Sequence, residues 1–306
     1  MTPRIVVAGS ANMDMTLRTP HMPAAGETVQ GLSLSYAPGG KGANQAVAAA
    51  RLGAQVAMVT RVGNDPAGPA VRCNLVDAGI DAMYVLDTPT EPQGIAVILV
   101  DDAGQNSIVL AAGSNGAISP DDVDACAAAF QGAQVTLLQN EIRMETTLRA
   151  AQLAKAAGAT VIWNPAPAPK GWPREMAGLV DIVIPNESET ERLTGLPVTD
   201  AASRERAAEA LLAMGFGTVV LTLGGEGALW VDGACSFQAP TFQVDVVDTT
   251  AAGDTFCGAL AVALAEGQPK PAAVRFACAA AALAVTKMGA QAGIPTRPEV
   301  EALLAR

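Results

Sequence analysis

Short runs of β-branched and other apolar residues alternate along the chain with alanine-rich segments of helical length. The apolar runs lack an alternation of polar and apolar positions, which is typical of parallel strands covered on both faces. The candidate strands are 5–8, 56–59, 135–138, 161–163, 182–184 and 219–222, and the candidate helices are about 43–52, 66–78, 120–130, 145–157, 187–194 and 201–214. This alternation predicts an α/β fold with a doubly wound, mostly parallel sheet flanked by helices and joined by right-handed crossovers.

Two stretches interrupt this rhythm, at about 13–36 and 93–112, where period-2 patterns and turn signals replace the helices. Asp102-Ala103-Gly104 lies between two strand-like halves of the second stretch and predicts a hairpin. We expect both stretches to form a small antiparallel β lid, able to cover a cleft or to pair with a second subunit as a homodimer. The sequence contains no linker rich in proline, glycine and serine, so 1–306 is predicted to be a single domain.

The composition and net charge of the chain indicate which kinds of molecule it can bind. Half of the 306 residues are hydrophobic, enough for an extensive core, and the net charge is −11. That charge disfavours nucleic acid as a partner but permits a small anion held by local amides and a lysine. No apolar run reaches the roughly 18 residues of a membrane span, and the first residues lack a secretory pattern. We therefore expect a cytoplasmic protein with no membrane partner.

Histidine and cysteine usage excludes several kinds of site. The chain has one histidine, His21, so a Ser–His–Asp triad would have to use it and any two-histidine site is excluded. Acid–base chemistry would then fall to carboxylates or lysine. The cysteines are scattered without CxxC spacing, so we expect buried reduced thiols rather than disulfides or a zinc site; they are Cys73, Cys126, Cys235, Cys257 and Cys278.

The segment 248–256, DTTAAGDTF, follows a strand-like run at 242–247 and precedes an apolar helix predicted at 256–265. Small residues entering a helix leave backbone N–H groups unpaired at the positive end of the helix dipole, which favours a developing anion such as a transferring phosphoryl group. Asp254 at this position can take a proton from an attacking hydroxyl. The alternative is that Asp254 is a plain helix N-cap.

A second glycine-rich segment, 38–46 (PGGKGANQA), also opens a helix. Its glycines let the backbone approach a ligand closely, and Lys41 and Asn44 offer hydrogen-bond donors to hydroxyls or phosphate. The segment is neither a Walker A loop nor a GxGxxG dinucleotide fingerprint. The alternative is a flexible loop.

Three further segments follow strands, where open α/β sheets bind ligands. The turn 222–228 is rich in glycine, although a β-hairpin turn would look the same. The acidic segment 186–191 offers carboxylates that could hold Mg²⁺ through water, or it simply begins a helix. Asn12 and Asp14 occupy alternate positions after the first strand and suit neighbouring hydroxyls of a sugar, although turns also recruit these residue types.

Eight motifs occur in order along the chain: GSANMDM at 9–15, PGGKGANQA at 38–46, LLQNEI at 137–142, NPAPA at 164–168, PNESE at 185–189, TLGGEGAL at 222–229, DTTAAGDTF at 248–256 and VTKMGAQAGIPTR at 285–297. Together they resemble the ribokinase (PfkB) family of carbohydrate kinases over essentially the whole chain. The resemblance implies transfer of the γ-phosphoryl group of ATP to O5 of D-ribose. Kinases for deoxyribose, another pentose or a nucleoside remain alternatives, as does a non-catalytic sugar-binding sensor of the same fold.

The resemblance also implies roles for individual residues. Asp254 would be the general base, beside an anion hole at Ala251, Ala252, Gly253 and Asp254. The sugar site would comprise Asn12, Asp14, Gly40, Lys41, Asn44, Glu141 and Asp254. The ATP site would comprise Asn186, Thr222, Gly224, Gly225, Gly227, Gly253 and Cys278, and Glu189 would act indirectly on Mg²⁺.

A potassium site and a dimer through the β lid are implied as well. The potassium positions would be Asp248, Thr250, Ala284, Lys287, Gly289 and Gly293. Two residues depart from the family pattern: Cys278 replaces a polar residue near the adenine, and Gly293 replaces a serine of the cation site. Asn12, Asp14, the PGGKGAN motif and Glu141 favour ribose as the acceptor.

Overall fold

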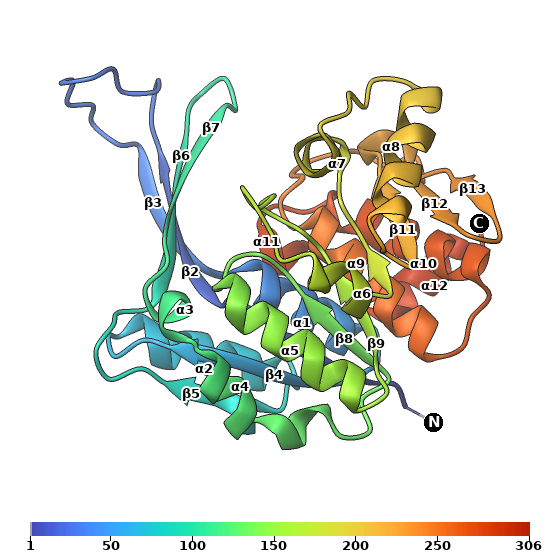
Figure 1. The fold of residues 1–306 in the computed structure, drawn as a ribbon. Helices are drawn as coiled ribbons and strands as arrows, with labels where there is room; N and C mark the ends of the chain where they lie inside the picture. Colours follow the sequence, from blue (N-terminus) through green and yellow to red (C-terminus); the bar gives the residue numbers. More distant parts are fainter. Residues whose placement is uncertain (1) are drawn as a thin grey trace.

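Nine strands form the main sheet of the protein, seen in a computed structural model that describes residues 2–306 (Figure 1). They are β1 (Arg4–Ala8), β4 (Gln55–Val62), β5 (Val85–Asp87), β8 (Val135–Leu138), β9 (Thr160–Trp163), β10 (Ile182–Val183), β11 (Thr218–Thr222), β12 (Ala228–Asp232) and β13 (Ser236–Ala239). Their order is β13-β12-β11-β10-β9-β8-β1-β4-β5, and all neighbours are parallel except β11–β12 and β12–β13. The six predicted strands and the mostly parallel sheet are confirmed.

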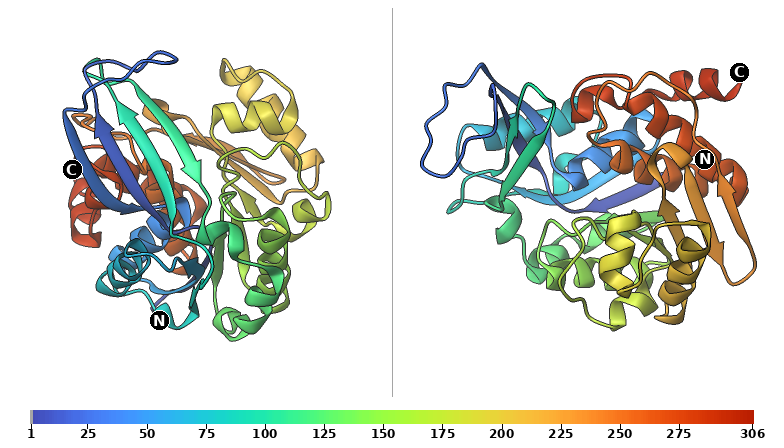
Figure 2. Two further views of the ribbon diagram at one scale, coloured as in Figure 1. Left: turned by 90° about the vertical axis from the view of Figure 1, so that its left-hand side faces the viewer. Right: turned by 90° about the horizontal axis from the view of Figure 1, so that it is seen from above.

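Both faces of this sheet are buried, as the unbroken apolar runs predict. In β1, Ile5 and Val7 belong to one core cluster, whereas Val6 and Ala8 belong to the other. The first core packs against α1 (Lys41–Arg51), α2 (Ala67–Asp77), α9 (Ala252–Ala265), α10 (Lys270–Ala284) and α12 (Arg297–Leu304). The second packs against α4 (Pro120–Ala125), α5 (Met144–Ala156), α6 (Glu175–Leu179), α7 (Glu187–Thr194) and α8 (Ala201–Ala213). The right-hand view of Figure 2 shows these two helical layers with strands between them.

The helix predictions hold with one exception. The predicted helix at 120–130 divides, because α4 ends at Ala125 and a 3₁₀ turn covers Ala127–Phe130. The backbone N–H of Cys126 is shared between the carbonyls of Asp122 and Val123 (3.0 and 3.1 Å), which marks the change from α to 3₁₀ geometry. Among residues 2–306, five helices lie outside the predicted set: α3 (Ser114–Ala117), α6, α10, α11 (Ala290–Gly293) and α12.

The predicted lid is a separate four-stranded sheet that projects from the body of the protein (Figure 1). Its strands are β2 (Asn12–Arg18), β3 (Ser33–Gly39), β6 (Gly94–Val100) and β7 (Asn106–Ala111), in the order β3-β2-β6-β7. The outer pairs are antiparallel, and β6 and β7 are joined by the predicted hairpin turn. The central pair β2–β6 is parallel, because both strands start beside the main domain, at Asn12 and Gly94, and run outward.

The strand expected at 242–247 is not formed, so that prediction is wrong. Phe242, Gln243, Val244 and Val246 of this run line a cavity instead of pairing in a sheet. Helix α9 begins at Ala252, four residues before the predicted start at 256. Asp254 therefore lies in the first turn of α9 rather than in a loop before it.

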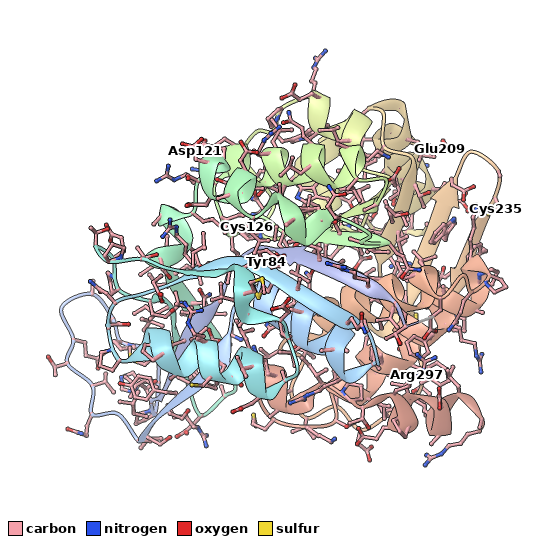
Figure 3. All side chains as sticks on the ribbon, turned by 90° about the horizontal axis from the view of Figure 1, so that it is seen from below. Tyr84, Asp121, Cys126, Glu209, Cys235 and Arg297 are labelled. Atoms are coloured by element: carbon pink, nitrogen blue, oxygen red, sulfur yellow. The ribbon has the colours of Figure 1, made fainter. Side chains whose placement is uncertain are left out.

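Within residues 2–306, no helix is both long and apolar enough to cross a bilayer. Cys126, Cys257 and Cys278 are buried free thiols, as expected. Cys73 on α2 and Cys235 in the β12–β13 turn are exposed, which corrects the expectation that all five are buried. Figure 3 shows Cys126 in the interior and Cys235 at the periphery.

Candidate active site

The predicted base and the predicted sugar-binding residues come together at the carboxyl ends of the main-sheet strands. Asn12 and Asp14 follow β1 and Glu141 follows β8, so the carboxyl ends of neighbouring strands supply them. Lys41 begins α1, and Asp254 lies in the first turn of α9. These two helices pack on each other through Gly258, where an added Cβ would lie 2.7 Å from the Cβ of Ala48.

Asp254 is buried, and both of its carboxylate oxygens accept hydrogen bonds from amide side chains. The Asn44 amide donates to Oδ2 at 3.0 Å, and the Gln45 amide donates to Oδ1 at 3.1 Å. The N-cap of α9 is Ala251, and the Asp254 side chain caps no N–H of its own helix. The alternative interpretation of Asp254 as a plain N-cap is therefore wrong.

The backbone amides at the start of α9 are available to a ligand. Ala251 has a φ of 60°, in the left-handed region, so the chain enters the helix in a conformation that is strained for alanine. Within residues 2–306, the N–H groups of Gly253 and Asp254 have no acceptor, and that of Ala252 has only a long contact to the Thr249 carbonyl (3.3 Å). The result is a set of free donors at the positive end of a helix dipole, suited to an anion.

Lys41 lies close enough to the carboxylates of Glu141 and Asp254 for their charges to change its pKa, and the same two carboxylates act on Asp14. The negative charge of Asp254 raises the pKa of Lys41, against burial that lowers it, and Glu141 raises it further, so Lys41 stays protonated. Burial, reinforced by the charges of Glu141 and Asp254, raises the pKa of Asp14 to about 7. The Oδ1 atom of Asp14 is buried and accepts no hydrogen bond from the described residues. An unpaired acceptor of this kind is positioned for a hydroxyl donor from a ligand.

Glu141 and Asn12 are held by the protein and line a common cavity of about 370 Å³. The Glu141 carboxylate accepts from the Ser10 hydroxyl (2.6 Å) and from the backbone N–H of Lys41 (3.0 Å). The Oδ1 atom of Asn12 accepts from Asn115 at 2.6 Å. At Gly40 (φ 90°), a Cβ would come within 2.7 Å of the Asn12 backbone nitrogen, so this close approach requires glycine. The segment 38–40 therefore ends β3 and leads directly into α1 through Gly40, and it is not a flexible loop.

All seven residues expected at the ATP site line a second cavity, of about 660 Å³. The glycine-rich turn is the tight connection of the β11–β12 hairpin, closed by a hydrogen bond from the Leu223 N–H to the Gly227 carbonyl (2.8 Å). The hairpin alternative is therefore correct, and the turn nevertheless forms one wall of the cavity. The sequence did not predict the opposite wall, which includes Phe242, Val244, Ala281, Ala282 and Val285.

Asn186 and Glu189 form a capping box at the start of α7. Asn186 accepts from the Glu189 N–H (2.8 Å), and the Glu189 carboxylate accepts from the Asn186 N–H (2.9 Å). Burial raises the pKa of Glu189, in part offset by the hydrogen bond from Asn186. No group of three or more His, Cys, Asp or Glu side chains in the described part of the chain could hold a metal ion. A divalent ion here would therefore depend on phosphate oxygens and water for most of its ligands.

The six predicted potassium-site residues form one connected structure beside α9. Asp248 accepts from the Thr250 hydroxyl (2.6 Å) and from the Gly289 N–H (2.8 Å), so it ties the 248–250 segment to the 287–293 loop. A Cβ at Gly293 would lie 2.6 Å from the Ala284 carbonyl oxygen and 3.5 Å from that of Lys287. The carbonyl oxygens of Ala284 and Lys287 therefore both lie beside Gly293, and a side chain at this position would meet the Ala284 carbonyl. Carbonyl oxygens suit a hard cation.

Comparison with known proteins agrees with this geometry. The model of the pfkB family of carbohydrate kinases matches residues 2–297. The chain therefore belongs to the pfkB family. This carbohydrate kinase is 42% identical to a ribokinase of Haemophilus influenzae, with 98% of this chain and 97% of the relative covered. It is also 38% identical to a deoxyribokinase of Salmonella typhi, with 95% of each chain covered.

Two solved structures resemble the kinase closely. A ribokinase from Thermotoga maritima superimposes with a TM-score of 0.90 at 41% identity, covering 99% of both chains. An Arabidopsis thaliana ribokinase complexed with ribose and ATP superimposes with a TM-score of 0.95 at 36% identity, covering 100% of both. The ribokinase-like fold predicted from the sequence is confirmed.

The structure of the kinase adds residues to which the sequence analysis gave no role. Ser10 and Asn115 orient Glu141 and Asn12, and Gln45 contacts Asp254 directly. Gln45 lies inside the motif PGGKGANQA, which the sequence analysis singled out. Its partner Asp254 is more than 200 residues away in the sequence, so the spacing of residues could not predict this contact. Asn115 lies in α3, outside every motif that was singled out.

Proposed function

We propose that this kinase transfers the γ-phosphoryl group of ATP to O5 of D-ribose, giving ribose 5-phosphate and ADP. The observation that carries the proposal is the junction at Asp254: a buried carboxylate next to free helix N–H groups, with Gly253 lining the larger cavity. Asn12 and Glu141 line the smaller cavity, close in space to Asp14 and Lys41. This arrangement separates a site for a polyhydroxylated acceptor from a site for a nucleotide.

In the proposed reaction, the O5 hydroxyl gives its proton to Asp254 as its oxygen attacks the γ-phosphorus. The bond from the γ-phosphorus to the β,γ-bridging oxygen breaks, and that oxygen leaves on ADP. The N–H groups of residues 251–254 hold the oxygens of the transferring group, where negative charge is concentrated. Lys41, protonated and buried beside Asp254, adds positive charge on the acceptor side.

Asn12 and Glu141, which line the smaller cavity, would bind sugar hydroxyls. Asp14, Asn44 and the backbone at Gly40 line neither cavity and would complete the sugar site beside Asp254. Asn186, Thr222, Gly224, Gly225, Gly227 and Cys278 would enclose ATP. Mg²⁺, bound mainly to the phosphates with Glu189 acting through water, would neutralise phosphate charge. At Cys278 the buried thiol lies 4.0 Å from the Ala239 carbonyl, so it offers the adenine little hydrogen bonding.

A panel of acceptors tests the proposal. Ribose, 2-deoxyribose, other pentoses and nucleosides are compared by kcat/KM in a coupled assay of ADP release. We expect ribose to rank first, supported by the ribokinase relatives; the deoxyribokinase relative makes deoxyribose the second candidate. Preference for a nucleoside would contradict the proposal, and sugar binding without ADP release would identify a sensor instead.

We also predict activation by K⁺ over Na⁺. A cation bound by the Ala284 and Lys287 carbonyls would stabilise the loop that Asp248 ties to the segment preceding the anion hole. We expect kcat to rise at least several-fold when K⁺ replaces Na⁺ at constant ionic strength. Tetramethylammonium serves as the inert reference, and Asp248→Asn should weaken the response. Equal rates in all three salts would contradict the site.

A homodimer through the lid is a further part of the proposal. Exposed apolar side chains on the outer strands of the lid support it; they are Leu34, Tyr36, Ile108, Val109 and Leu110. Pairing of two lids would remove these side chains from water and cover unpaired strand edges. The expected cytoplasmic location stays a prediction from the sequence.

A further inference from the structure

We infer that Gln45 is a positioning residue for Asp254, and that Asn164 fixes the direction in which the Gln45 amide points, while Gln139 donates to the Gln45 amide oxygen. This inference rests on the proposed function, because it concerns the carboxylate that acts there as the base. Gln45 in α1 has no exposed surface, whereas Asn44 and Asp254 are each 5% exposed. A ligand at Asp254 can therefore reach Asn44 but not Gln45, which acts through other side chains.

The orientation of the network is determined at the Asn164 end. The Ile184 backbone carbonyl can only accept, so the Asn164 Nδ2 group must donate to it (2.7 Å). The Asn164 Oδ1 atom then faces Gln45 and accepts from its Nε2 at 3.2 Å. Asp254, at 3.1 Å from the same nitrogen, is also an acceptor when ionised. Two acceptors on one side leave only one possible orientation of the Gln45 amide.

Gln139 contacts Gln45 on the other side, and the Oε1 atom of Gln139 has no partner among the described residues. Its Nε2 donates to Gln45 Oε1 at 2.7 Å, so a flipped Gln45 amide would bring two donors together and two pairs of acceptors together. Gln139 fits because residue 9 is glycine: a Cβ there would lie 1.9 Å from the Gln139 Oε1 atom. Gln45, Gln139 and Asn164 are all at least nine-tenths buried, so bulk water cannot substitute for their partners.

The two donors to Asp254 differ in how firmly they are held. Asn44, which donates to Oδ2, has a buried Oδ1 atom without a partner among the described residues, so its amide is free to turn toward a ligand. Gln45 has every polar atom engaged and cannot turn. Gln45 therefore holds Oδ1 in place, while Oδ2 remains the oxygen that can exchange Asn44 for a substrate hydroxyl.

The test is the pair of variants Gln45→Met and Gln139→Met, which keep the side-chain length and remove the hydrogen bonds. We expect Gln45→Met to lower kcat about 10²-fold, the cost of a small misplacement of a reacting group. The KM values for ribose and ATP should stay within about threefold of wild type, because binding groups are untouched. Gln139→Met should lower kcat by a smaller factor, of about 10, because it releases the Gln45 amide without removing it.

A coupling measurement separates positioning from a merely structural role. In an Asp254→Asn background, Gln45→Met should cause no further loss of kcat, because the carboxylate that it positions is gone. Gln134→Met is the control: Gln134 precedes β8 as Gln139 follows it, and its exposed amide makes two hydrogen bonds to the backbone of Arg4 and Ala265, away from Asp254. We expect this control to keep wild-type kcat.

Three outcomes would overturn the inference: wild-type kcat in Gln45→Met, a loss confined to KM, or an equal loss of kcat in the Asp254→Asn background. If Gln45→Met does not fold, Gln139→Met gives the same test through the neighbouring residue. Wild-type turnover in Asp254→Asn alone would instead overturn the proposed function, and with it the role of Gln45.

Discussion

Replacing Asp254 with asparagine is expected to lower kcat on the order of 10³-fold, within the range typical of a lost general base. Asparagine is isosteric but cannot accept the O5 proton, so the loss falls on the transition state and the KM values change little. The Asn44 amide has a free oxygen and can turn to accept from the new NH₂ group, so the fold should tolerate the change.

Steady-state kinetics with ribose and ATP measure this effect. Asp121→Asn is the matched control, because Asp121 is an exposed carboxylate on α4, remote from the cavities (Figure 3). We expect the control to keep wild-type kcat. Turnover of Asp254→Asn within tenfold of wild type would contradict the assignment of the base.

The second large effect is expected at Asp14, where function and stability oppose each other. Burial and two neighbouring carboxylates raise the pKa of Asp14 to about 7 from its ordinary 3.8. Below 3.8 the side chain is protonated in both the folded and unfolded states, so its burial carries no charge penalty. Between 3.8 and 7 only the unfolded state loses the proton, so stability falls as the pH rises. Asp14→Asn should therefore raise the melting temperature of the ligand-free kinase at pH 8, and raise it less at pH 5.

The same substitution should impair sugar binding. The unpaired Oδ1 atom of Asp14 is expected to accept a ribose hydroxyl, and hydrogen bonds to charged groups contribute about 1.5–3 kcal/mol. We expect the ribose KM to rise roughly 10- to 100-fold, with a smaller effect on the ATP KM. In the wild type, the ribose KM should rise as the pH falls below about 7. A lower melting temperature of Asp14→Asn at pH 8, or an unchanged ribose KM, would contradict this account.

The sequence predicted the parallel strands that are short runs buried on both faces, such as β1 and β8. It missed the parallel strand β5, in which only Val85 is buried and Asp87 is exposed. It failed at 242–247, because a run of strand-forming residue types does not show whether the backbone is paired. There the residues border a cavity instead. The parallel pairing of β2 with β6 could not be predicted either, because the main-sheet strands β4 and β5 lie between β2 and β6 in the sequence.

The sequence predicted those residues of the candidate site that lie within recognisable motifs. Residues such as Asp254, Lys41 and Glu141 lie in short motifs after strands or at helix starts, where local chemistry marks them. The supporting network could not be predicted, because Gln45, Gln139 and Asn164 act through contacts across 94 to 209 positions of sequence. The sequence around Gln45 does not show which residue its amide contacts, because its partners follow other strands or begin another helix.

Identification of the product is the most direct test of the account. The wild-type kinase is incubated with ATP, Mg²⁺, K⁺ and ribose, and the phosphorylated sugar is examined by ³¹P–¹H correlation spectroscopy. The account predicts one ADP per phosphorylated ribose, with the phosphorus coupled to the methylene protons of C5. Phosphorus coupled to the C1 proton, or ribose that stays unphosphorylated while ATP is intact, would contradict it.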